Sequence, residues 1–320
     1  MPLVYYPDSN PGILRRAQGR GFSYLAPDGT RITDRAERDR LAALAVPPAY
    51  RDVWMAPMPN AHLLATGRDA RGRKQYRYHP DWTAARDRTK FDTLVDVGHA
   101  LPRLRRWITQ NLGGAAGEQS TAIAAVLALI DRGAIRPGDL AYTEDNGSYG
   151  ALTLEDRHLS TDGARIALHY TAKGGTEVAK HLTGARLAHV LHRSADLPGP
   201  RLFDYRGDSG EMVPLRAEHL SDVLGDVAGD RVTPKSLRTW AGTLAAFRVA
   251  RSLGDAVRIK DMAEATAERL HNTPTIARTS YIHPDVIALA DGGAARVATL
   301  DDDGPTELRQ GEAALLRFLA

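Results

Sequence analysis

Apolar and polar residues follow two different patterns along this chain, and the change between them divides it in two. Up to about residue 85, apolar residues occur in short runs bounded by turn residues, which is typical of β-strands. Segments 22–26 and 30–32 flank the turn Pro27-Asp28-Gly29 and predict a hairpin. Further strands are expected at 53–55, 62–66 and 75–79.

Helical spacing dominates the second part, where apolar residues recur at intervals near 3.6. Residues 91–112 and 121–130 are predicted helices, and Gly133 is expected to terminate the second one. Strand signals return at 151–154, 165–170 and 177–179, and helices resume from about residue 182. We therefore expect an α+β protein, with a small, mostly antiparallel β domain at 1–85 and a larger, mainly α-helical domain with a small sheet at 86–320.

Composition narrows the possible classes of protein. The chain has 320 residues, of which 43% are hydrophobic and 25% charged, so it can bury real cores. It contains no cysteine, which excludes disulfides, cysteine-ligated metals and a thiol nucleophile. No apolar run approaches the length of a membrane span, and residues 1–7 lack the features of a signal peptide. We expect a cytoplasmic protein without a membrane partner.

The net charge of +3 is weak evidence for a polyanionic partner, but the basic residues are concentrated. Residues 68–90 contain eight Lys or Arg against three Asp. Such a run is usually a solvated face. On a strand, however, arginine alternating with glutamine and tyrosine suits a duplex groove, because cations contact phosphates while Gln and Tyr reach base edges. The candidate DNA contacts are Arg73, Lys74, Gln75, Tyr76 and Tyr78.

Familiar catalytic motifs are absent. The chain has no phosphate-binding Gly-x4-Gly-Lys-Ser/Thr loop, no strand-linked Gly-x-Gly-x-x-Gly, no His-Glu-x-x-His and no Gly-x-Ser-x-Gly elbow. Its eleven histidines are scattered, which gives little support to a histidine metal site. We expect neither a metal nor a cofactor.

A sharply delimited helix near the C-terminus carries the most informative tyrosine. Thr273 is a good N-cap, Pro274 suits the first helical position, and Tyr281 ends the helix. A single tyrosine in this setting is usually a half-buried aromatic residue. Four other polar residues also have local settings that expose their side chains. Asn272 precedes this helix, Arg136 follows the end of another helix, Lys173 is at a hairpin tip and Arg238 is near a helix start.

Four segments containing these residues resemble, in order, the active-site segments of type IB DNA topoisomerases, in particular the small poxvirus-like and bacterial enzymes. The segments are 134–138 followed by Tyr142, 172–175, 235–239 and 272–281. Residues 67–78 also resemble the strand with which that family contacts the DNA groove. Poxviral and eukaryotic members carry histidine nine residues before the tyrosine, where this chain has Asn272. His271 is adjacent but one residue out of register.

The resemblance implies a role for each residue. Tyr281 would attack a phosphodiester and form a 3′-phosphotyrosyl link, Arg136 and Arg238 would stabilise the phosphorane, and Lys173 would protonate the leaving 5′ oxygen. Asn272 would donate to a non-bridging oxygen, with His271 as the alternative, and Tyr142 would contact the backbone near the site. The implied protein is a monomeric, nucleoid-associated enzyme that clamps and relaxes double-stranded DNA without ATP or metal.

Two other functions fit parts of this pattern. A tyrosine site-specific recombinase shares the nucleophile and the arginines, and a non-catalytic DNA-binding clamp would share the fold. Lys235, three residues before Arg238, and the N-terminal β domain favour the topoisomerase. The sequence specifies neither a preferred DNA site nor how open the clamp is without DNA.

Overall fold

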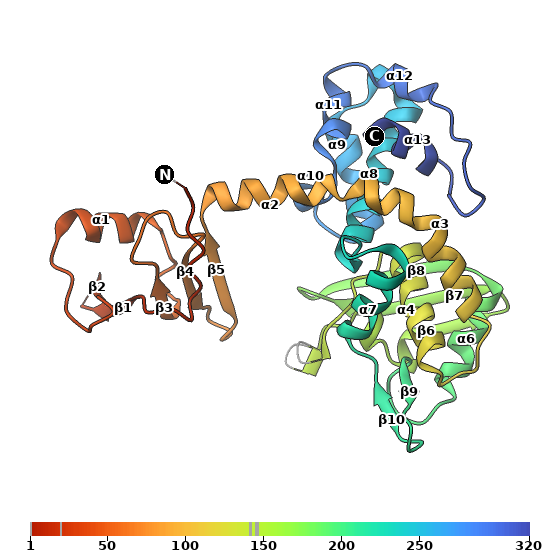
Figure 1. Ribbon diagram of the computed structural model, residues 1–320, viewed down its shortest axis with the longest axis horizontal. Coiled ribbons are helices and arrows are strands. Elements are labelled where there is room, and N and C mark those ends of the chain that lie inside the picture. Colours follow the sequence, from red (N-terminus) through yellow and green to blue (C-terminus); the bar gives the residue numbers. More distant parts are fainter. Residues whose placement is uncertain (1, 20, 141–142, 145–146) are drawn as a thin grey trace. The chain divides into compact units, whose positions relative to one another are not determined.

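The computed structural model describes residues 2–19, 21–140, 143–144 and 147–320. The chain forms two compact units, Met1–Thr89 and Lys90–Ala320, which are described separately below. About 48% of the residues are helical and 19% are in strands. The first unit is built on an antiparallel sheet and the second is mainly helical (Figure 1), so the expected α+β class is confirmed.

The first unit is a five-stranded antiparallel sheet with strand order β2-β1-β3-β4-β5. Helix α1 (Arg35–Ala43) accompanies the sheet and is capped by Asp34, whose side chain accepts from the Glu37 N–H. The predicted hairpin turn at 27–29 follows β2 instead of lying between two full strands, because residue 31 forms only an isolated bridge to Leu25. The strands are β1 (Ile13–Gln18), β2 (Gly21–Leu25), β3 (Arg51–Met55), β4 (Leu63–Arg68) and β5 (Lys74–Tyr78).

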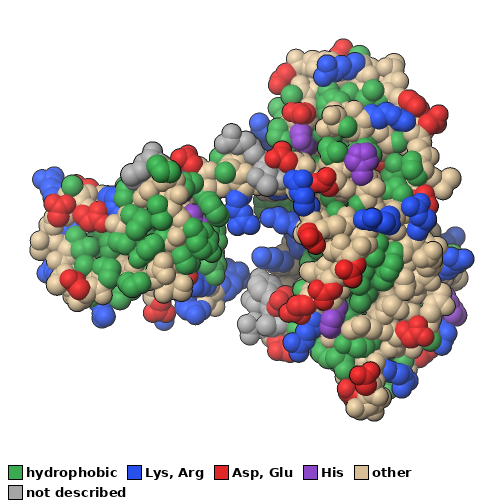
Figure 2. All heavy atoms as spheres, viewed as in Figure 1, with side chains coloured by type: hydrophobic (Ala, Val, Ile, Leu, Met, Phe, Trp, Pro, Cys, Tyr) green, Lys and Arg blue, Asp and Glu red, His purple; other side chains and the backbone are tan. Residues whose placement is uncertain are grey.

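Two small hydrophobic clusters stabilise this sheet. One joins Ile13, Tyr24, Leu41, Val53, Met55 and Ala65, and the other is centred on Trp54 and Leu63. Much of the visible face of this unit in Figure 2 is nevertheless hydrophobic. Its exposed large apolar residues are Val4, Tyr5, Leu14, Tyr76 and Tyr78.

Helix α2 (Pro80–Asp92) begins in the first unit and ends in the second. The apolar spacing predicted one helix from 91 to 112, but the helical run is interrupted at Thr93, and α3 (Leu94–Asn111) follows. Thr93 turns its hydroxyl back to the Lys90 carbonyl, at 2.8 Å. Threonine favours such local side-chain bonds over helix continuation, which accounts for the interruption.

The second unit is organised around α8 (Pro234–Leu253), which packs against α3, α4 (Gln119–Gly133), α9 (Ile259–Leu270) and α10 (Pro274–Tyr281). Figure 1 shows α9, α11, α12 and α13 gathered at one end of this unit and the small sheet beside α4 at the other. Among the described residues, the other helices of this unit include α6 (Ala185–Ala195), α7 (Ala217–Ala228), α11 (Pro284–Ala288), α12 (Ala294–Ala298) and α13 (Glu312–Leu319), with short 3₁₀ turns at Ala151–Thr153, Asp156–His158, Gly254–Ala256 and Leu289–Asp291.

A buried ion cluster joins α3, α4 and α13 inside this helical unit. The Arg105 guanidinium contacts Asp131 at 2.9 Å and Glu312 at 2.6 Å, and Trp240 donates to Glu312 at 3.2 Å. Arg309 also pairs with Asp131. Because each buried charge has an opposite partner, the cluster avoids the large penalty of an isolated ion and fixes how the three helices meet.

The small sheet consists of three antiparallel strands, β6 (Leu159–Asp162), β7 (Arg165–Ala172) and β8 (Thr176–Thr183). A separate two-stranded ribbon pairs β9 (Asp204–Arg206) with β10 (Met212–Pro214). The strand predicted at 151–154 is wrong. Residues 151–153 form a buried 3₁₀ turn, because the N–H groups of Ala151 and Leu152 donate to the carbonyls of Arg136 and Pro137 rather than to a sheet.

Candidate active site

The segment carrying Arg136 leaves α4 through a left-handed residue. The sequence predicted that Gly133 would terminate this helix, but Gly133 is helical and the left-handed conformation falls on Ala134, with φ of 51°. Glycine serves a different purpose here, since a Cβ at Gly133 would approach Ile135 to 3.0 Å. The Arg136 carbonyl then accepts from Ala151 at 2.8 Å, which fixes the arginine's backbone.

Asn272 follows a second left-handed residue, His271, whose φ is 49° at the end of α9. The Asn272 Oδ1 accepts a short hydrogen bond of 2.5 Å from the Arg136 Nη2. Because a guanidinium can only donate, this bond assigns the orientation of the amide and turns Nδ2 away from the arginine. That Nδ2 is buried without a partner among the described residues. An acceptor brought by a ligand would satisfy it.

Tyr281 is the last residue of α10, and its backbone is fastened to α8. The Tyr281 carbonyl accepts from the Thr243 hydroxyl at 3.1 Å, and the same hydroxyl accepts from the His283 N–H at 3.1 Å. A Cβ added to Gly242 would meet the Tyr281 carbonyl oxygen at 2.8 Å and the Tyr281 Cβ at 3.0 Å. Glycine at position 242 therefore allows α8 and Tyr281 to approach each other more closely than any side chain would permit.

The Tyr281 ring has cations close by. The Arg238 Cζ lies 5.6 Å and the Lys90 Nζ 5.7 Å from the ring centroid. Arg238 comes from the start of α8, is only 3% exposed, and donates weakly to the Leu270 carbonyl at 3.4 Å. Burial lowers the pKa of Arg238, while Tyr281 raises it through charge and a side-chain hydrogen bond. Arginine stays charged, so it can stabilise negative charge developing beside the tyrosine.

Lys173 stands at the tip of the β7–β8 hairpin, as its sequence predicted. The turn continues through Gly174 and Gly175, with φ of 87° and 76°, values that glycine adopts at no steric cost. Lys173 itself is exposed. A hairpin tip holds the lysine on a sheet while leaving its side chain accessible to a substrate.

Four of the five residues predicted to be catalytic line one cavity of about 380 Å³, and the fifth, Asn272, is joined to it through Arg136. These four come from segments far apart in the sequence. Lys235 also lines the cavity, one helical turn before Arg238. It was not predicted as a site residue, although it lies in the 235–239 segment that resembles the family's active site. The lining residues are Arg136, Pro137, Gly138, Asp139, Ser148, Tyr149, Lys173, Lys235, Arg238 and Tyr281.

Comparison with known protein families gives a match over most of the chain. Residues 78–278 match the family described as eukaryotic DNA topoisomerase I, catalytic core, and residues 21–69 match the bacterial DNA topoisomerase IB N-terminal domain. The chain belongs to the type IB DNA topoisomerases. It is therefore an enzyme that acts on DNA, as its sequence motifs predicted.

Viral relatives of this topoisomerase extend the match along the chain. DNA topoisomerase 1B of Acanthamoeba polyphaga mimivirus is 25% identical over 85% of this chain and 85% of its own length. DNA topoisomerase 1B of Vaccinia virus (strain Copenhagen) is 23% identical over 48% of this chain and 45% of its own length. DNA topoisomerase 1 of Rabbit fibroma virus (strain Kasza) is 21% identical over 76% of each.

The residues expected to contact DNA lie on β5 and the turn before it, in the first unit of the topoisomerase. Tyr76 and Tyr78 are exposed and stack with ring centroids 6.1 Å apart, as expected for one face of a strand. Lys74 pairs with Asp8 at 2.5 Å. Both Arg73 and Gln75 bond to Asp69. DNA phosphates would have to compete with these carboxylates. Tyr142 lies outside the described residues.

Two further findings concern other partners of the enzyme. Within the described ranges, no group of three or more His, Asp and Glu side chains is arranged to hold a metal ion. Among the same residues, no helix is long and apolar enough to cross a membrane.

Gly242→Ala should impair the topoisomerase through the position of Tyr281. The added methyl group would press on the Tyr281 carbonyl and Cβ, which are joined to α8 and cannot move freely. Overpacking of this kind costs about 1–3 kcal/mol of stability. Displacing a nucleophile by about 1 Å can cost about a hundredfold in rate. Relaxation of supercoiled plasmid and urea unfolding measure the two effects.

Gly225→Ala provides the matched control, since Gly225 also lies inside a helix, α7. There a Cβ would meet only the Asp230 carboxylate at 3.2 Å, at the end of an exposed side chain that can move. Alanine in a helix interior is favoured over glycine by up to about 1 kcal/mol. Equal loss of activity in both variants would contradict the role assigned to Gly242.

Lys180 on β8 is a partly buried lysine next to the catalytic segments. Its Nζ donates to the Arg269 carbonyl at 2.7 Å, three residues before Asn272. Burial lowers the pKa of Lys180 to about 8, helped by the charges of Arg269 and Arg238 and opposed by Glu268. Burial also lowers the pKa of His271, and the charge of Lys180 adds to this effect. Several cations therefore lie close together beside the catalytic segments.

The Lys180 pKa predicts that stability rises between about pH 8 and pH 9.5. In this range the unfolded chain keeps the proton on Lys180 while the folded protein releases it, and stability increases with pH wherever the unfolded state binds more protons. Below pH 8 both states are protonated and the contribution is constant. Urea unfolding at pH 7.5 and 9.5 should show a rise that Lys180→Met removes and Lys260→Met, at an exposed lysine of α9, retains. Equal rises in both variants would exclude Lys180 as the source.

Proposed function

We propose that this topoisomerase relaxes duplex DNA by a transient single-strand break, with Tyr281 as nucleophile. The convergence of Arg136, Lys173, Arg238 and Tyr281 on one cavity is the observation that carries the proposal. Together with Lys235, four cations and a phenol line this cavity, a set that suits a phosphodiester, whose negative charge increases during attack.

The reaction begins as the Tyr281 oxygen attacks the phosphorus and the phenol loses its proton. The bond from phosphorus to the 5′ oxygen breaks, leaving a 3′-phosphotyrosyl ester and a free 5′-hydroxyl. Because the enzyme ester holds the bond energy, the reverse attack by the 5′-hydroxyl reseals the strand without ATP. Rotation of the free end between the two steps releases supercoils.

The other residues act on charge and protons. Arg136 and Arg238 stabilise the equatorial oxygens of the phosphorane with fixed positive charge, and no metal is required. Lys173 donates a proton to the leaving 5′ oxygen. Asn272 donates from Nδ2 to a non-bridging oxygen, a role supported by its unpaired buried Nδ2 and by the bond that orients it on Arg136.

The first unit provides DNA contacts in this proposal. Arg73 and Lys74 bind phosphates, while Gln75, Tyr76 and Tyr78 reach into a groove. Exposure of the stacked pair Tyr76 and Tyr78 supports this assignment. By the resemblance alone, Tyr142 adds a further contact to the phosphate backbone. The enzyme acts as a monomer on the nucleoid in the cytoplasm.

Relaxation of supercoiled plasmid in EDTA without ATP tests the mechanism. We expect both supercoil signs to be removed, and a strict need for magnesium or nucleotide would exclude the proposal. The polarity of the link is tested with a duplex whose cleaved strand is labelled at one end. The 5′ label should be recovered with the protein; recovery of the 3′ label instead would mean a 5′-phosphotyrosyl link.

The same experiments separate the alternatives. A tyrosine recombinase would exchange strands between two specific sites and assemble as a tetramer, whereas relaxation by a monomer on unrelated plasmids supports the topoisomerase mechanism. A non-catalytic clamp would bind with a steep salt dependence and give no covalent adduct.

A further inference from the structure

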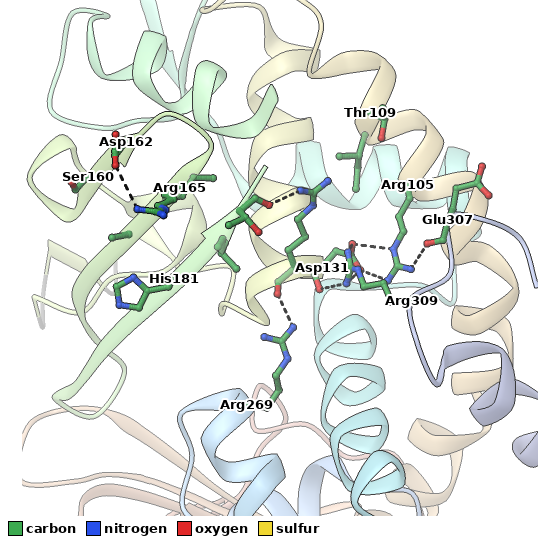
Figure 3. A pocket seen from close by; sticks show the side chains of 16 residues that line it. Arg105, Thr109, Asp131, Ser160, Asp162, Arg165, His181, Arg269, Glu307 and Arg309 are labelled. Carbon is green, nitrogen blue, oxygen red and sulfur yellow. Dashed lines mark hydrogen bonds and ion pairs between the residues drawn. The ribbon is translucent and has the colours of Figure 1, made fainter. Parts of the chain in front are cut away.

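The second unit contains a larger cavity outside the candidate active site. It has a volume of about 820 Å³, within the range typical of small-molecule sites. The sheet β6–β8, the end of α4, and parts of α3 and α9 line it, together with the segment before α13. Figure 3 shows Arg165 and His181 on the sheet side of this cavity, and Arg105, Asp131 and Arg309 across from them.

Positive charge exceeds negative charge on the cavity wall. Five arginines and three carboxylates line it. Two of the three carboxylates already form ion pairs. Asp131 pairs with Arg105 and Arg309, and Glu307 pairs with Arg106, which does not line the cavity. The third, Asp162, lies 3.9 Å from Arg165 in a fully solvated pair, which contributes little.

Arg132 and Arg269 are the two cations on this wall without a carboxylate partner among the described residues. Arg132 donates only to the Thr183 carbonyl at 3.3 Å, and Arg269 to the Arg132 carbonyl at 2.6 Å. Both are partly buried. Burial lowers the pKa of each guanidinium, and the charge of Arg309 adds to the effect. A bound anion would relieve this repulsion.

We propose that this cavity binds a free oligophosphate, such as the phosphate chain of a nucleotide, through Arg132, Arg165 and Arg269. Guanidinium groups hold phosphate oxygens in pairs, and three of them match a chain of several phosphates better than a single anion. The wall also has an apolar part that suits a base or ring attached to the phosphates. It consists of Ile108, Ile166, Ala167 and Leu182.

Two of the proposed ligand-binding arginines lie a few residues along the chain from the catalytic residues. Arg132 lies four residues before Arg136, and Arg269 lies three residues before Asn272. The bond from Arg269 to the Arg132 carbonyl joins these two segments directly. A phosphate that draws the Arg269 guanidinium into the cavity would weaken that bond, so we expect a saturating ligand to slow DNA relaxation.

Calorimetric titration of the full chain with inorganic tripolyphosphate, without DNA or metal, tests the site. Loss of a charged hydrogen bond should weaken binding at least about tenfold in Arg132→Gln and in Arg165→Gln. Arg165 is exposed, so its variant tests the site even if Arg132→Gln unfolds. Arg296→Gln, at an exposed arginine of α12 that does not line the cavity, should bind like the wild type.

A second comparison separates this cavity from the active site. Arg136→Gln removes a cation from the catalytic cavity only, so binding of tripolyphosphate should persist. Absence of binding to the wild type, or loss of binding in Arg136→Gln with retention in Arg132→Gln and Arg165→Gln, would overturn the proposal. Because binding is measured directly, its outcome does not depend on the mechanism proposed for Tyr281.

Discussion

Tyr281→Phe should abolish relaxation while the protein still folds and binds DNA. The substitution removes one oxygen, and with it the only atom proposed to form the covalent link. Loss of a nucleophile typically costs about 10⁴-fold or more. The ring would keep its packing against Ala134, Ala241 and Leu270, so the protein should remain folded although the hydrogen bond to Arg238 is lost. Plasmid relaxation, adduct formation and a DNA-binding titration measure the three properties.

The control for this variant is a tyrosine that is close to the same cations but does not line the cavity. Tyr170 is 4% exposed on β7, and burial raises its pKa to about 12, which keeps its phenol protonated. Tyr170→Phe should therefore retain relaxation. If Tyr281→Phe relaxed DNA as well as the wild type, Tyr281 would be structural and the whole assigned site would be wrong.

Lys173→Ala should slow cleavage of ordinary DNA by about 10²- to 10⁴-fold, the usual contribution of a general acid. A substrate with sulfur in place of the bridging 5′ oxygen should remove most of this defect. A thiolate leaves without being protonated, because the pKa of a thiol is far below that of an alcohol. Single-turnover cleavage of the two substrates measures the difference. The exposed hairpin tip makes loss of folding unexpected.

Arg136→Ala is the matched comparison, because it also removes one cation from the cavity. Its proposed role is to stabilise charge on the phosphorane, which both substrates require, so it should remain slow on both. A Lys173 variant that stayed equally slow on the sulfur substrate would show that Lys173 acts electrostatically and is not the acid.

Local signals in the sequence were sufficient for much of the site. The Gly174-Gly175 turn required a hairpin and so determined that Lys173 stands at its tip. Thr273 and Pro274 determined the start of α10, and the Thr273 side chain accepts from the Ile276 N–H as an N-cap should. These features depend on backbone conformations accessible to a few residues only, which is why they could be predicted.

Where packing competed with local preference, the sequence was a poor guide. Gly133 has the conformational freedom to terminate α4, yet it stays helical and Ala134 adopts the left-handed conformation. A Cβ at 133 would approach Ile135 to 3.0 Å and Leu182 of β8 to 3.6 Å, so packing explains the glycine at this position. Residues 151–153 have strand composition but bond to the Arg136 segment as a 3₁₀ turn. At 151–153 the deciding contact is with the Arg136 segment, which lies outside the range of local preference.

The sequence by itself determined the α+β class, the catalytic motifs and hence the topoisomerase family, because these depend on residue types at fixed spacing. Only the tertiary structure decided that Arg136, Lys173, Arg238 and Tyr281 share one cavity, that Asn272 is oriented by Arg136, and that Gly242 sets the position of Tyr281. The physical reason is the distance along the chain over which each kind of interaction acts. Turn and capping preferences act over a few residues, whereas convergence depends on how the helices and the sheet of the second unit pack.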